Sequence, residues 1–375
     1  MRIIGGTMGQ ETEVLVIGGG PAGLAAAIAI RKKGFEVTVA DGAKPPIDKA
    51  CGEGLMPNTI AALHELGIPI HPSDGQIFHG LRFIEGKTEA EANFPGESGI
   101  GIARTVLHSK MVERAEECGV SLLWSTPVSG LTKAGVVLRG REMRAKWVIG
   151  ADGIRSRVRH WSGLDFASRH KVRFAQRRHY RIRPWTQHVE IYWGRMKQAY
   201  VTPLGDQETC VALISDDPRM RLEDAWNEFP LLAARVQGAS LSGVDRGGVT
   251  VMSRLRRVYR GNVVLTGDAS GSVDAITGEG LCLSFRQAMA LADSLGSGRL
   301  ETYQRAHRRL SRATYVMSGL LVWFGRNGKL RQRALQVLDR DPEIFARLFA
   351  GHLGKSSPLD LAATSLRFGR QFLAA

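Results

Sequence analysis

Six residues near the start of the chain have the types and spacing needed to bind a dinucleotide. The stretch "VLVIGGGPAGLAAAIAIRKKGFEVTVAD" carries a G-x-G-x-x-G motif made by Gly18, Gly20, Pro21, Ala22 and Gly23. Its glycines permit a tight turn, close approach to a pyrophosphate and close helix packing, and the helix N-terminus stabilises the anion. Asp41, eighteen residues after Gly23, can accept a hydrogen bond from a ribose hydroxyl. This acid disfavours a 2′-phosphate, so the motif predicts FAD or NAD rather than NADP.

The elements around the motif are readable from the hydrophobic pattern. "VLVI" is typical of a buried strand, "PAGLAAAIAIRKKG" of a helix that ends at Gly34, and "EVTVAD" of the next strand. Two further apolar strands end in "GADG" (Asp152, Gly153) and "GDASG" (Gly267, Asp268). Short alternating stretches over 75–103 and 170–215 predict antiparallel strands, and the chain after residue 300 is largely helical in pattern.

These elements predict an α/β protein with a discontinuous domain plan. A Rossmann-like dinucleotide-binding domain is expected from residues 11–75, 100–165 and 250–300. Residues 76–99 and 166–249 are expected to form an inserted antiparallel β-sheet domain that binds substrate. Residues 301–375 are expected to form a helical C-terminal region.

The three motifs, in this order, resemble the flavoprotein hydroxylases that have the p-hydroxybenzoate hydroxylase fold. Relatives of that group include the geranylgeranyl reductases and the flavin-dependent halogenases. The resemblance covers residues 13–300 and implies an FAD-binding domain of the glutathione reductase type. It also implies FAD as the cofactor, with NADPH or NADH binding transiently as the hydride donor.

The resemblance also assigns roles to single residues. Asp268 would contact the ribityl chain or the pyrophosphate, and Asp152 and Gly153 would line the groove beside it. Arg104 matches an arginine that reaches the cofactor from the start of a helix, and Val128 matches a backbone contact to the adenine. Each has a purely structural alternative, such as a helix cap, a turn or a surface ion pair.

The tetrapeptide Gly-Glu-Gly-Leu occurs twice, in "CGEGL" (51–55) and "TGEGL" (277–281). In the family, the second place begins a helix whose amides face the flavin ring, so Gly278, Gly280 and Leu281 are expected there. The first resembles the C-G-E-G loop of geranylgeranyl reductases, which brings Gly54 toward the same ring. We interpret the pair as two loops that approach one ligand, and coincidence is the alternative.

Two reactions fit such a flavoprotein. In the first, the protein is an NAD(P)H-dependent monooxygenase that uses a C4a-hydroperoxyflavin to hydroxylate an aromatic, polyketide-like or lipid-like substrate. The alternative is a reductase of alkene bonds in a prenyl lipid, which Cys51 in "CGEG" favours. The reductases' Y-x-W-x-F-P stretch is missing, however, and Ala275 stands where proline is common in them. The sequence therefore favours the monooxygenase, and a non-catalytic flavin-binding protein is the alternative of another class.

The candidate catalytic residues are Cys51, Tyr192 and Tyr200. Cys51 can steer substrate over the flavin, and a tyrosine on the substrate sheet can hold or deprotonate a phenol. Packing is the alternative for each of them. We expect no metal site, because the sequence has no metal-ligand spacing.

The charge distribution suggests partners. The chain carries a formal net charge of +15, and residues 155–183 hold nine arginines and one lysine against the single acid Asp165. This window predicts an anionic or carrier-bound substrate or an acidic membrane surface, unless its arginines pair elsewhere in the fold.

The apolar and basic segment 315–338 is typical of an interfacial helix or of a helix packed on the core. Nucleic acid is not favoured, because no recognition motif occurs. Four unpaired cysteines and the lack of a long apolar run predict a cytoplasmic, or membrane-associated, protein.

Overall fold

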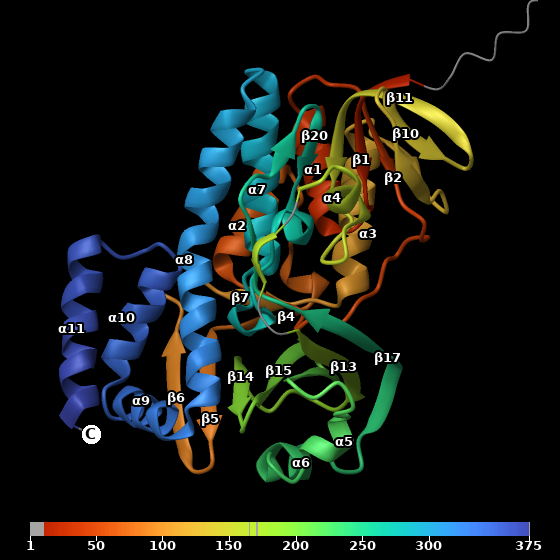
Figure 1. Ribbon diagram of the computed structural model, residues 1–375. Coiled ribbons are helices and arrows are strands. Elements are labelled where there is room, and N and C mark those ends of the chain that lie inside the picture. Colours follow the sequence, from red (N-terminus) through yellow and green to blue (C-terminus); the bar gives the residue numbers. More distant parts are fainter. Residues whose placement is uncertain (1–10, 165, 170–171, 375) are drawn as a thin grey trace, which may run out of the picture.

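The computed structural model describes residues 11–164, 166–169 and 172–374. Three parts surround a common centre (Figure 1). A domain built on a parallel sheet lies at the upper right, a large β-sheet lies below it, and the C-terminal helices lie at the left. The expected mixed α/β fold, with a Rossmann-like domain, a second sheet and a helical C-terminus, is therefore confirmed.

The parallel sheet places the motif strands side by side. β1 (Glu11–Ile17) lies between β2 (Val37–Ala40) and β11 (Arg141–Gly150), and both pairings are parallel. β8 (Ser121–Leu123) pairs with β2, and β20 (Val263–Leu265) pairs with β11, again in parallel. The chain thus leaves β1 toward one neighbour and returns on the other side, which makes the end of β1 a topological switch point.

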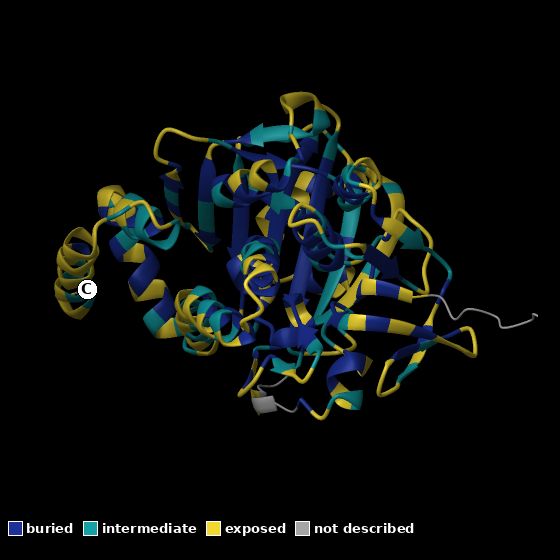
Figure 2. Ribbon diagram, turned by 90° about the horizontal axis from the view of Figure 1, so that it is seen from above, coloured by how far each residue is buried: buried dark blue, intermediate teal, exposed yellow. Residues whose placement is uncertain are grey.

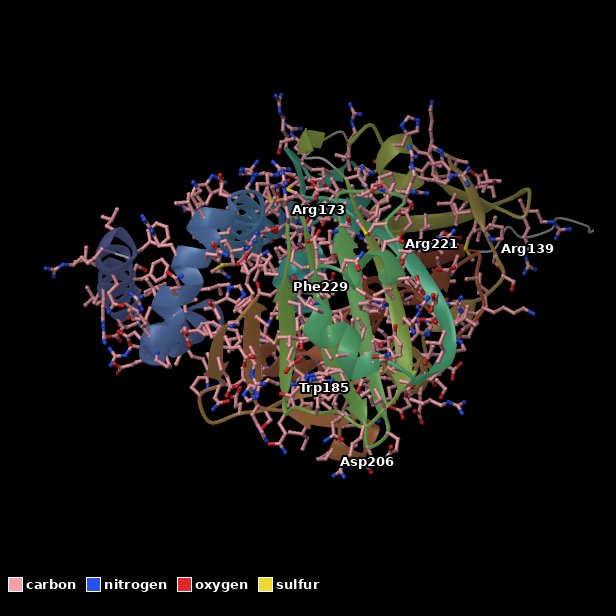
Figure 3. All side chains as sticks on the ribbon, turned by 90° about the horizontal axis from the view of Figure 1, so that it is seen from below. Arg139, Arg173, Trp185, Asp206, Arg221 and Phe229 are labelled. Atoms are coloured by element: carbon pink, nitrogen blue, oxygen red, sulfur yellow. The ribbon has the colours of Figure 1, made fainter. Side chains whose placement is uncertain are left out.

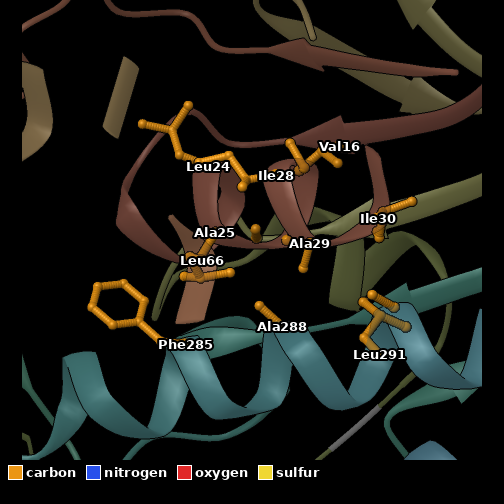
Figure 4. Packing of buried hydrophobic residues seen from close by; sticks show 14 of the residues in the cluster. Val16, Leu24, Ala25, Ile28, Ala29, Ile30, Leu66, Phe285, Ala288 and Leu291 are labelled. Atoms are coloured by element: carbon orange, nitrogen blue, oxygen red, sulfur yellow. The ribbon is translucent and has the colours of Figure 1, made fainter. Parts of the chain in front are cut away.

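Helix α1 (Pro21–Arg31) packs between this sheet and α7 (Gly280–Gly296). Figure 4 shows its small alanine side chains facing Ala288 and Leu291 of α7. On its other side α1 lies close to the turn that follows β1. Gly23 permits this close approach, because a Cβ there would lie 1.7 Å from the carbonyl oxygen of Gly18. The glycine that the motif predicts for close helix packing therefore has a direct steric reason.

The large sheet has seven strands in the order β17-β13-β16-β15-β14-β5-β6. Most pairings are antiparallel, as expected, but β14 and β5 pair in parallel. In chain order the strands are β5 (Gly80–Glu85), β6 (Thr88–Asn93), β13 (Arg173–Arg181), β14 (His188–Trp193), β15 (Lys197–Gly205), β16 (Glu208–Ser215) and β17 (Ser240–Thr250). Both predicted inserts thus contribute strands to one sheet.

The remaining elements connect these layers. The short strands are β3 (Gly54–Leu55), β4 (Gln76–Phe78), β7 (Gly99–Gly101), β9 (Val128–Leu131), β10 (Gly135–Leu138), β12 (Phe166–Arg169), β18 (Ser253–Leu255) and β19 (Tyr259–Arg260). The helices are α2 (Pro57–Leu66), α3 (Arg104–Glu117), α4 (Arg157–Trp161), α5 (Leu222–Ala225) and α6 (Pro230–Val236). Short 3₁₀ helices cover Pro72–Asp74, Gly267–Ser270 and Ala275–Thr277.

The C-terminal region consists of α8 (Leu300–Arg326), α9 (Gly328–Arg340), α10 (Pro342–His352) and α11 (Pro358–Ala374). The start of this region also packs on the parallel-sheet domain, because Tyr303 of α8 is buried in the core of that domain and donates a hydrogen bond to the carbonyl of Leu265. The expected single helix over 315–338 is wrong. The chain breaks at Asn327, which separates α8 from α9.

Four arginines of the basic window 155–183 contribute to the fold. Arg159, Arg173, Arg177 and Arg178 all bind oxygen atoms of distant segments. Asp165 and Lys171, which the window includes, lie outside the described residues. The acids that balance this window are therefore distant in sequence, and the local charge count overstates the positive charge available to a partner.

Arg173 and Arg177 are the most buried of these arginines. Arg173 lies at one end of the large sheet, opposite the turn that carries Asp206 (Figure 3). Its guanidinium binds Asp216 and Asp274, each at 2.9 Å, and also Gln198. Asp274 belongs to the loop after β20, so Arg173 ties the large sheet to the parallel-sheet domain.

We expect Arg173→Met to lower the free energy of unfolding by roughly 3 to 5 kcal/mol, because it leaves a buried carboxylate without its partner. Urea denaturation followed by circular dichroism measures this change. Arg181→Met on the same strand is the matched control, since Arg181 is exposed. Equal losses in both variants would contradict a special role for Arg173.

Candidate functional site

The carboxyl ends of four parallel strands meet at one edge of the sheet. β1 leads to Gly18, β2 to Asp41, β11 to Asp152 and β20 to Asp268. Gly18 and all three acids line one cavity of about 1810 Å³. Ligands bind at this position in open α/β sheets, outside the strand ends and at the switch point. The sequence motifs, separated by more than 200 residues, therefore converge on a single site.

The glycine turn has the geometry of a phosphate cradle. Gly18 has a φ of 111°, and a Cβ there would lie 2.5 Å from the carbonyl oxygen of Ala151. Gly20, by contrast, has no atom within 4 Å of its Cβ position, so the space above it is free for a ligand. Pro21 and Ala22 complete the cavity wall at the N-terminus of α1. Backbone amides and the helix dipole thus face open space that suits an anion.

Asp41 and Arg104 flank this turn. The carboxylate of Asp41 accepts hydrogen bonds from the amides of Gly19 at 2.6 Å and Ala43 at 2.7 Å, which fixes it at the cavity edge. The Nε atom of Arg104 is buried and makes no hydrogen bond within the described protein. A buried donor without a partner costs free energy unless a ligand supplies the acceptor. These residues therefore fit the ribose and phosphate groups of FAD.

Asp268 faces the cavity beyond the glycine turn. The Asp268 side chain is exposed to the cavity. The surrounding protein desolvates the carboxylate and raises its pKa, and the positive charges of Lys49 and Arg104 partly oppose this rise. Gly267 does not line the cavity; a Cβ there would lie 2.6 Å from the Cβ of Ala22.

A buried polar chain supports the Gly267–Ser270 turn from behind. Gln287 accepts a hydrogen bond from the amide of Gly267 at 3.0 Å. The hydroxyl of Ser270 binds the carbonyl of Gly267 and the Nε2 of His307, each at 2.8 Å. Burial, together with the charge of Arg308, lowers the pKa of His307 to about 4. His307 is therefore neutral at physiological pH, and the turn that presents Asp268 depends on a neutral imidazole.

Asp152, Gly153 and Val128 also line the cavity. The Asp152 carboxylate accepts hydrogen bonds from the hydroxyl of Ser156 and from the amides of Arg157 and Val158. Asp152 thus holds the turn that leads into α4, which agrees with its structural alternative as a turn residue, and Ser156 is the N-cap of that helix. A role of Asp152 toward a cofactor stays a prediction.

The two Gly-Glu-Gly-Leu loops reach the same cavity from segments more than 200 residues apart in the sequence. Gly54 of the first loop and Gly278, Gly280 and Leu281 of the second all line it. The Cβ position of Gly280 has no atom within 4 Å, so the N-terminus of α7 opens toward the ligand space. The two loops therefore converge in space, as the interpretation of one shared ligand requires.

Glu53 anchors the first loop. It has a φ of 58° and is 3% exposed, and its carboxylate binds the amide of Arg104 at 2.8 Å and the imidazole of His179. Thr202 of the large sheet donates a hydrogen bond to the carbonyl of Gly52 at 2.7 Å. The loop is thus fixed between the parallel-sheet domain and the large sheet.

Glu53, His179 and Cys210 lie close enough to hold a metal ion, with ligand atoms within 4.8 Å of one another. The guanidinium of Arg177 lies 3.0 Å from His179 and 3.9 Å from Glu53. A cation there would meet this fixed positive charge and would have to break the Glu53–His179 contact. The cluster is better explained as an internal ion network.

The three candidate catalytic residues differ in position. Cys51 lines the cavity and its sulfur accepts a hydrogen bond from the amide of Glu53 at 3.4 Å. Tyr200 also lines the cavity, but its hydroxyl donates to the carbonyl of Ile276 at 3.0 Å and burial raises its pKa far above neutrality. The Tyr200 hydroxyl is therefore engaged within the protein, and a role toward substrate stays a prediction.

Tyr192 does not reach the cavity, and its interpretation as a catalytic residue needs correction. Side chains alternate along a strand, so Tyr192 points to the face opposite Ile191 and Trp193, which line the cavity. Its hydroxyl donates to Glu190 at 2.8 Å and its ring packs against Phe229. Tyr192 therefore belongs to the core beneath the sheet.

Beyond the two loops the cavity continues as an apolar space between the large sheet and the C-terminal helices. Its lining there includes Phe83, Ile191, Trp193, Ile214, Phe324, Leu335, Leu338, Phe345, Phe349 and Phe368. Arg331, which also lines it, is bound to Glu85 by two hydrogen bonds. This half of the cavity suits a long hydrocarbon group.

Glu279 and His352 form an ionisable pair at the junction of the polar and apolar halves. Nε2 of His352 lies 3.2 Å from Oε1 of Glu279, and both side chains line the cavity. The sequence analysis missed this pair. Glu279 was visible inside the repeated tetrapeptide, but His352, 73 residues later, carries no motif.

Comparison with known proteins identifies the family. Residues 11–315 match the family of FAD binding domains (FAD_binding_3), so this chain belongs to that family of FAD-dependent oxidoreductases. It is 29% identical over 338 residues to a menaquinone reductase of Mycolicibacterium smegmatis, covering 82% of each chain. It is 31% identical over 298 residues to digeranylgeranylglycerophospholipid reductase 1 of Methanopyrus kandleri, covering 72% of this chain and 77% of that one.

The fold is also that of known flavoproteins. A flavoprotein/dehydrogenase from Cytophaga hutchinsonii superposes with a TM-score of 0.79 at 21% identity, covering 92% of this chain and 93% of that one. Proteins named as FAD-dependent monooxygenases are also among the relatives and solved structures of this fold. The expected resemblance to flavoprotein monooxygenases and geranylgeranyl reductases is therefore confirmed. Family membership leaves the reaction open.

In the described part of the chain, no helix is both long and apolar enough to cross a membrane.

The buried imidazole of His307 makes a pH-dependent prediction. The unfolded chain takes up a proton near pH 6.5, whereas folded His307 does so only near pH 4. Between these values protons favour the unfolded state, so this group should remove roughly 3 kcal/mol of stability as pH falls from 6.5 to 4. His307→Gln should flatten this slope in urea denaturation. Exposed His160→Gln controls for the loss of an imidazole, and an unchanged slope in the His307 variant would contradict the assignment.

Proposed function

We propose that this protein is an FAD-dependent reductase that hydrogenates an alkene bond in the isoprenoid chain of a lipid. The observation that carries this proposal is the cavity, which runs from the glycine motif into an apolar space lined by the large sheet and the C-terminal helices. At about 1810 Å³ it exceeds the roughly 300 to 1,000 Å³ of ordinary ligand pockets. It has room for a dinucleotide and a second, elongated ligand.

The chemistry of the lining favours a hydrocarbon over a small polar aromatic substrate. A phenolic or carboxylated substrate needs polar groups that orient it, because unpaired buried polar atoms are costly. In the apolar half, Arg331 is occupied by Glu85 and the hydroxyl of Tyr200 by Ile276. The reductases among the relatives are named for menaquinone and for a geranylgeranylated lipid. The sequence alone favours hydroxylation, whereas the apolar lining of the cavity supports reduction of a lipid.

Reduction of a carbon–carbon double bond adds one hydride and one proton. Bound FAD, reduced by NADPH or NADH, would supply the hydride. The apolar lining would hold the chain, exclude water and leave the proton to an acid of the protein. His352 is placed for this role, because its imidazole lines the cavity wall 3.2 Å from the carboxylate of Glu279. The imidazole would give a proton to the substrate carbon and recover one from solvent.

The product distinguishes the two reactions. Purified protein is incubated without oxygen with NADPH or NADH and a menaquinone that carries an unsaturated isoprenoid chain, and the product is analysed by mass spectrometry. A gain of two hydrogens in the chain is expected. A product that appears only in air and has gained one oxygen atom would overturn the proposal in favour of a monooxygenase. A protein that stays yellow with either nicotinamide cofactor would support a non-catalytic flavin-binding protein.

Leu338→Trp tests whether the apolar half holds the chain. Leu338 of α9 lines the cavity, so the larger ring should lower kcat/KM for a long isoprenoid chain at least tenfold, with a smaller loss for a one-unit chain. Leu330→Trp on the same helix is the matched control, because Leu330 does not line the cavity. Equal losses for both chain lengths would place the substrate elsewhere.

His352→Gln tests the proton source. The variant should lower kcat by roughly 100-fold or more while the KM for substrate and the FAD content stay near wild type. A solvent isotope effect on kcat should rise, because proton delivery becomes the slow step. A change in KM or FAD content alone would instead show that His352 positions the second loop.

A further inference from the structure

One face of α8 is exposed and divided into a basic half and an apolar half. Arg305, Arg309 and Arg312 are followed by Val316, Leu320 and Trp323, at spacings of three or four residues that place all six on one side of the helix. All six are exposed, with 68% for Val316, 44% for Leu320 and 46% for Trp323. We call these six residues the α8 stripe.

The positive charge of the stripe is available to a partner. Unlike Arg173, Arg177 and Arg178 of the 155–183 window, Arg309 and Arg312 make no ion pair or side-chain hydrogen bond in the described part of the chain. Arg254, Arg256 and Arg257, on the neighbouring β18 segment, are also exposed, and Arg308 binds the carbonyl of Arg256. The basic half of the stripe therefore belongs to a wider positively charged surface.

The apolar half is continuous with the cavity. Val316 and Leu320 line the cavity, as do Arg309 and Arg312 of the basic half and Leu361 and Phe368 of α11. Leu361 is itself 36% exposed, so apolar side chains are open to solvent on both sides of this opening. Figure 1 shows α8 and α11 on the same side of the molecule, and Figure 2 shows that the helix at the C-terminus, α11, is largely exposed. The apolar half of the site thus opens through an apolar rim.

We propose that the α8 stripe docks on an anionic lipid bilayer and that the opening between α8 and α11 faces the acyl region. Arginines near an anionic surface and an aromatic residue at the interface are the groups that bind peripheral proteins to membranes. The route by which substrate enters rests on the proposed reductase function, whereas the docking surface does not. A second copy of this chain fits the stripe less well, because the arginine rows would then repel each other.

Binding to vesicles without quinone tests the surface directly. The FAD-loaded protein should sediment with vesicles of phosphatidylglycerol and phosphatidylcholine and bind vesicles of phosphatidylcholine alone far more weakly. Replacing Arg305, Arg309 and Arg312 together by Gln should weaken binding to the anionic vesicles roughly 100-fold. Replacing Val316, Leu320 and Trp323 together by Ser should weaken it at least tenfold.

A charge-matched control separates the stripe from the net charge of +15. Arg139, Arg141 and Arg144 are exposed on the β10–β11 hairpin, and Figure 3 shows Arg139 at the far end of the molecule from α11. Their replacement by Gln removes the same charge and should change binding less than threefold. Equal weakening by both triple variants would overturn the proposal in favour of non-specific attraction.

Hydrogen exchange on the wild-type protein provides a measurement that needs no variant. Anionic vesicles should slow exchange within residues 305–323, and protection confined to other segments would overturn the proposal. Light scattering without lipid identifies the competing occupant. A concentration-dependent dimer that the Val316, Leu320 and Trp323 replacement abolishes would make the stripe a contact between copies. Failure to bind vesicles would leave the reductase proposal standing, because the product assay does not depend on docking.

Discussion

Buried arginine–carboxylate pairs hold the three parts of this protein around one cavity. Arg173 joins the large sheet to Asp274 after β20, Arg177 joins it to Asp48 and Glu53 before α2, and Arg331 joins α9 to Glu85 of β5. A bidentate or doubly paired arginine fixes both distance and direction, which a purely apolar contact does not. The cavity depends on these pairs because its walls come from segments that no single element connects.

The fold and the cofactor end of the site were largely readable from sequence. The glycine motif, "GADG" and "GDASG" each follow an apolar strand, and parallel pairing of those strands brings Gly18, Asp152 and Asp268 to one edge. The local sequence pattern is enough to predict this end of the site, because the carboxyl ends of paired parallel strands lie next to one another. The partner of each buried arginine could not be predicted, because pairing such as Arg177 with Asp48 depends on the packing of two domains.

The substrate end of the site was less predictable for the same physical reason. A hydrocarbon-binding wall needs only apolar side chains, and Phe345 or Leu338 looks like any core residue until the cavity is seen. Tyr192 and Tyr200 lie on neighbouring strands, β14 and β15, and point to opposite faces of the sheet. The strand register that decides which face is which comes from pairing, for example of Ile191 with Tyr200. His352 could not be identified as a site residue from sequence, because only the fold brings it into contact with Glu279.

Helix α8 has a mechanical consequence. Its 27 residues form one unbroken rod of about 40 Å, whose first turns carry Tyr303 and His307 against the Gly267–Ser270 turn. Its last turns carry Trp323 at the outer surface and end at Asn327, where the chain bends into α9. A stiff rod with no internal hinge transmits a tilt from one end to the other instead of absorbing it. A tilt of α8 at its outer end would therefore reach the turn that presents Asp268. It would also move α9 and α11, because Arg331 donates to the carbonyl of Gly325 and the ring of Phe324 packs against Phe372.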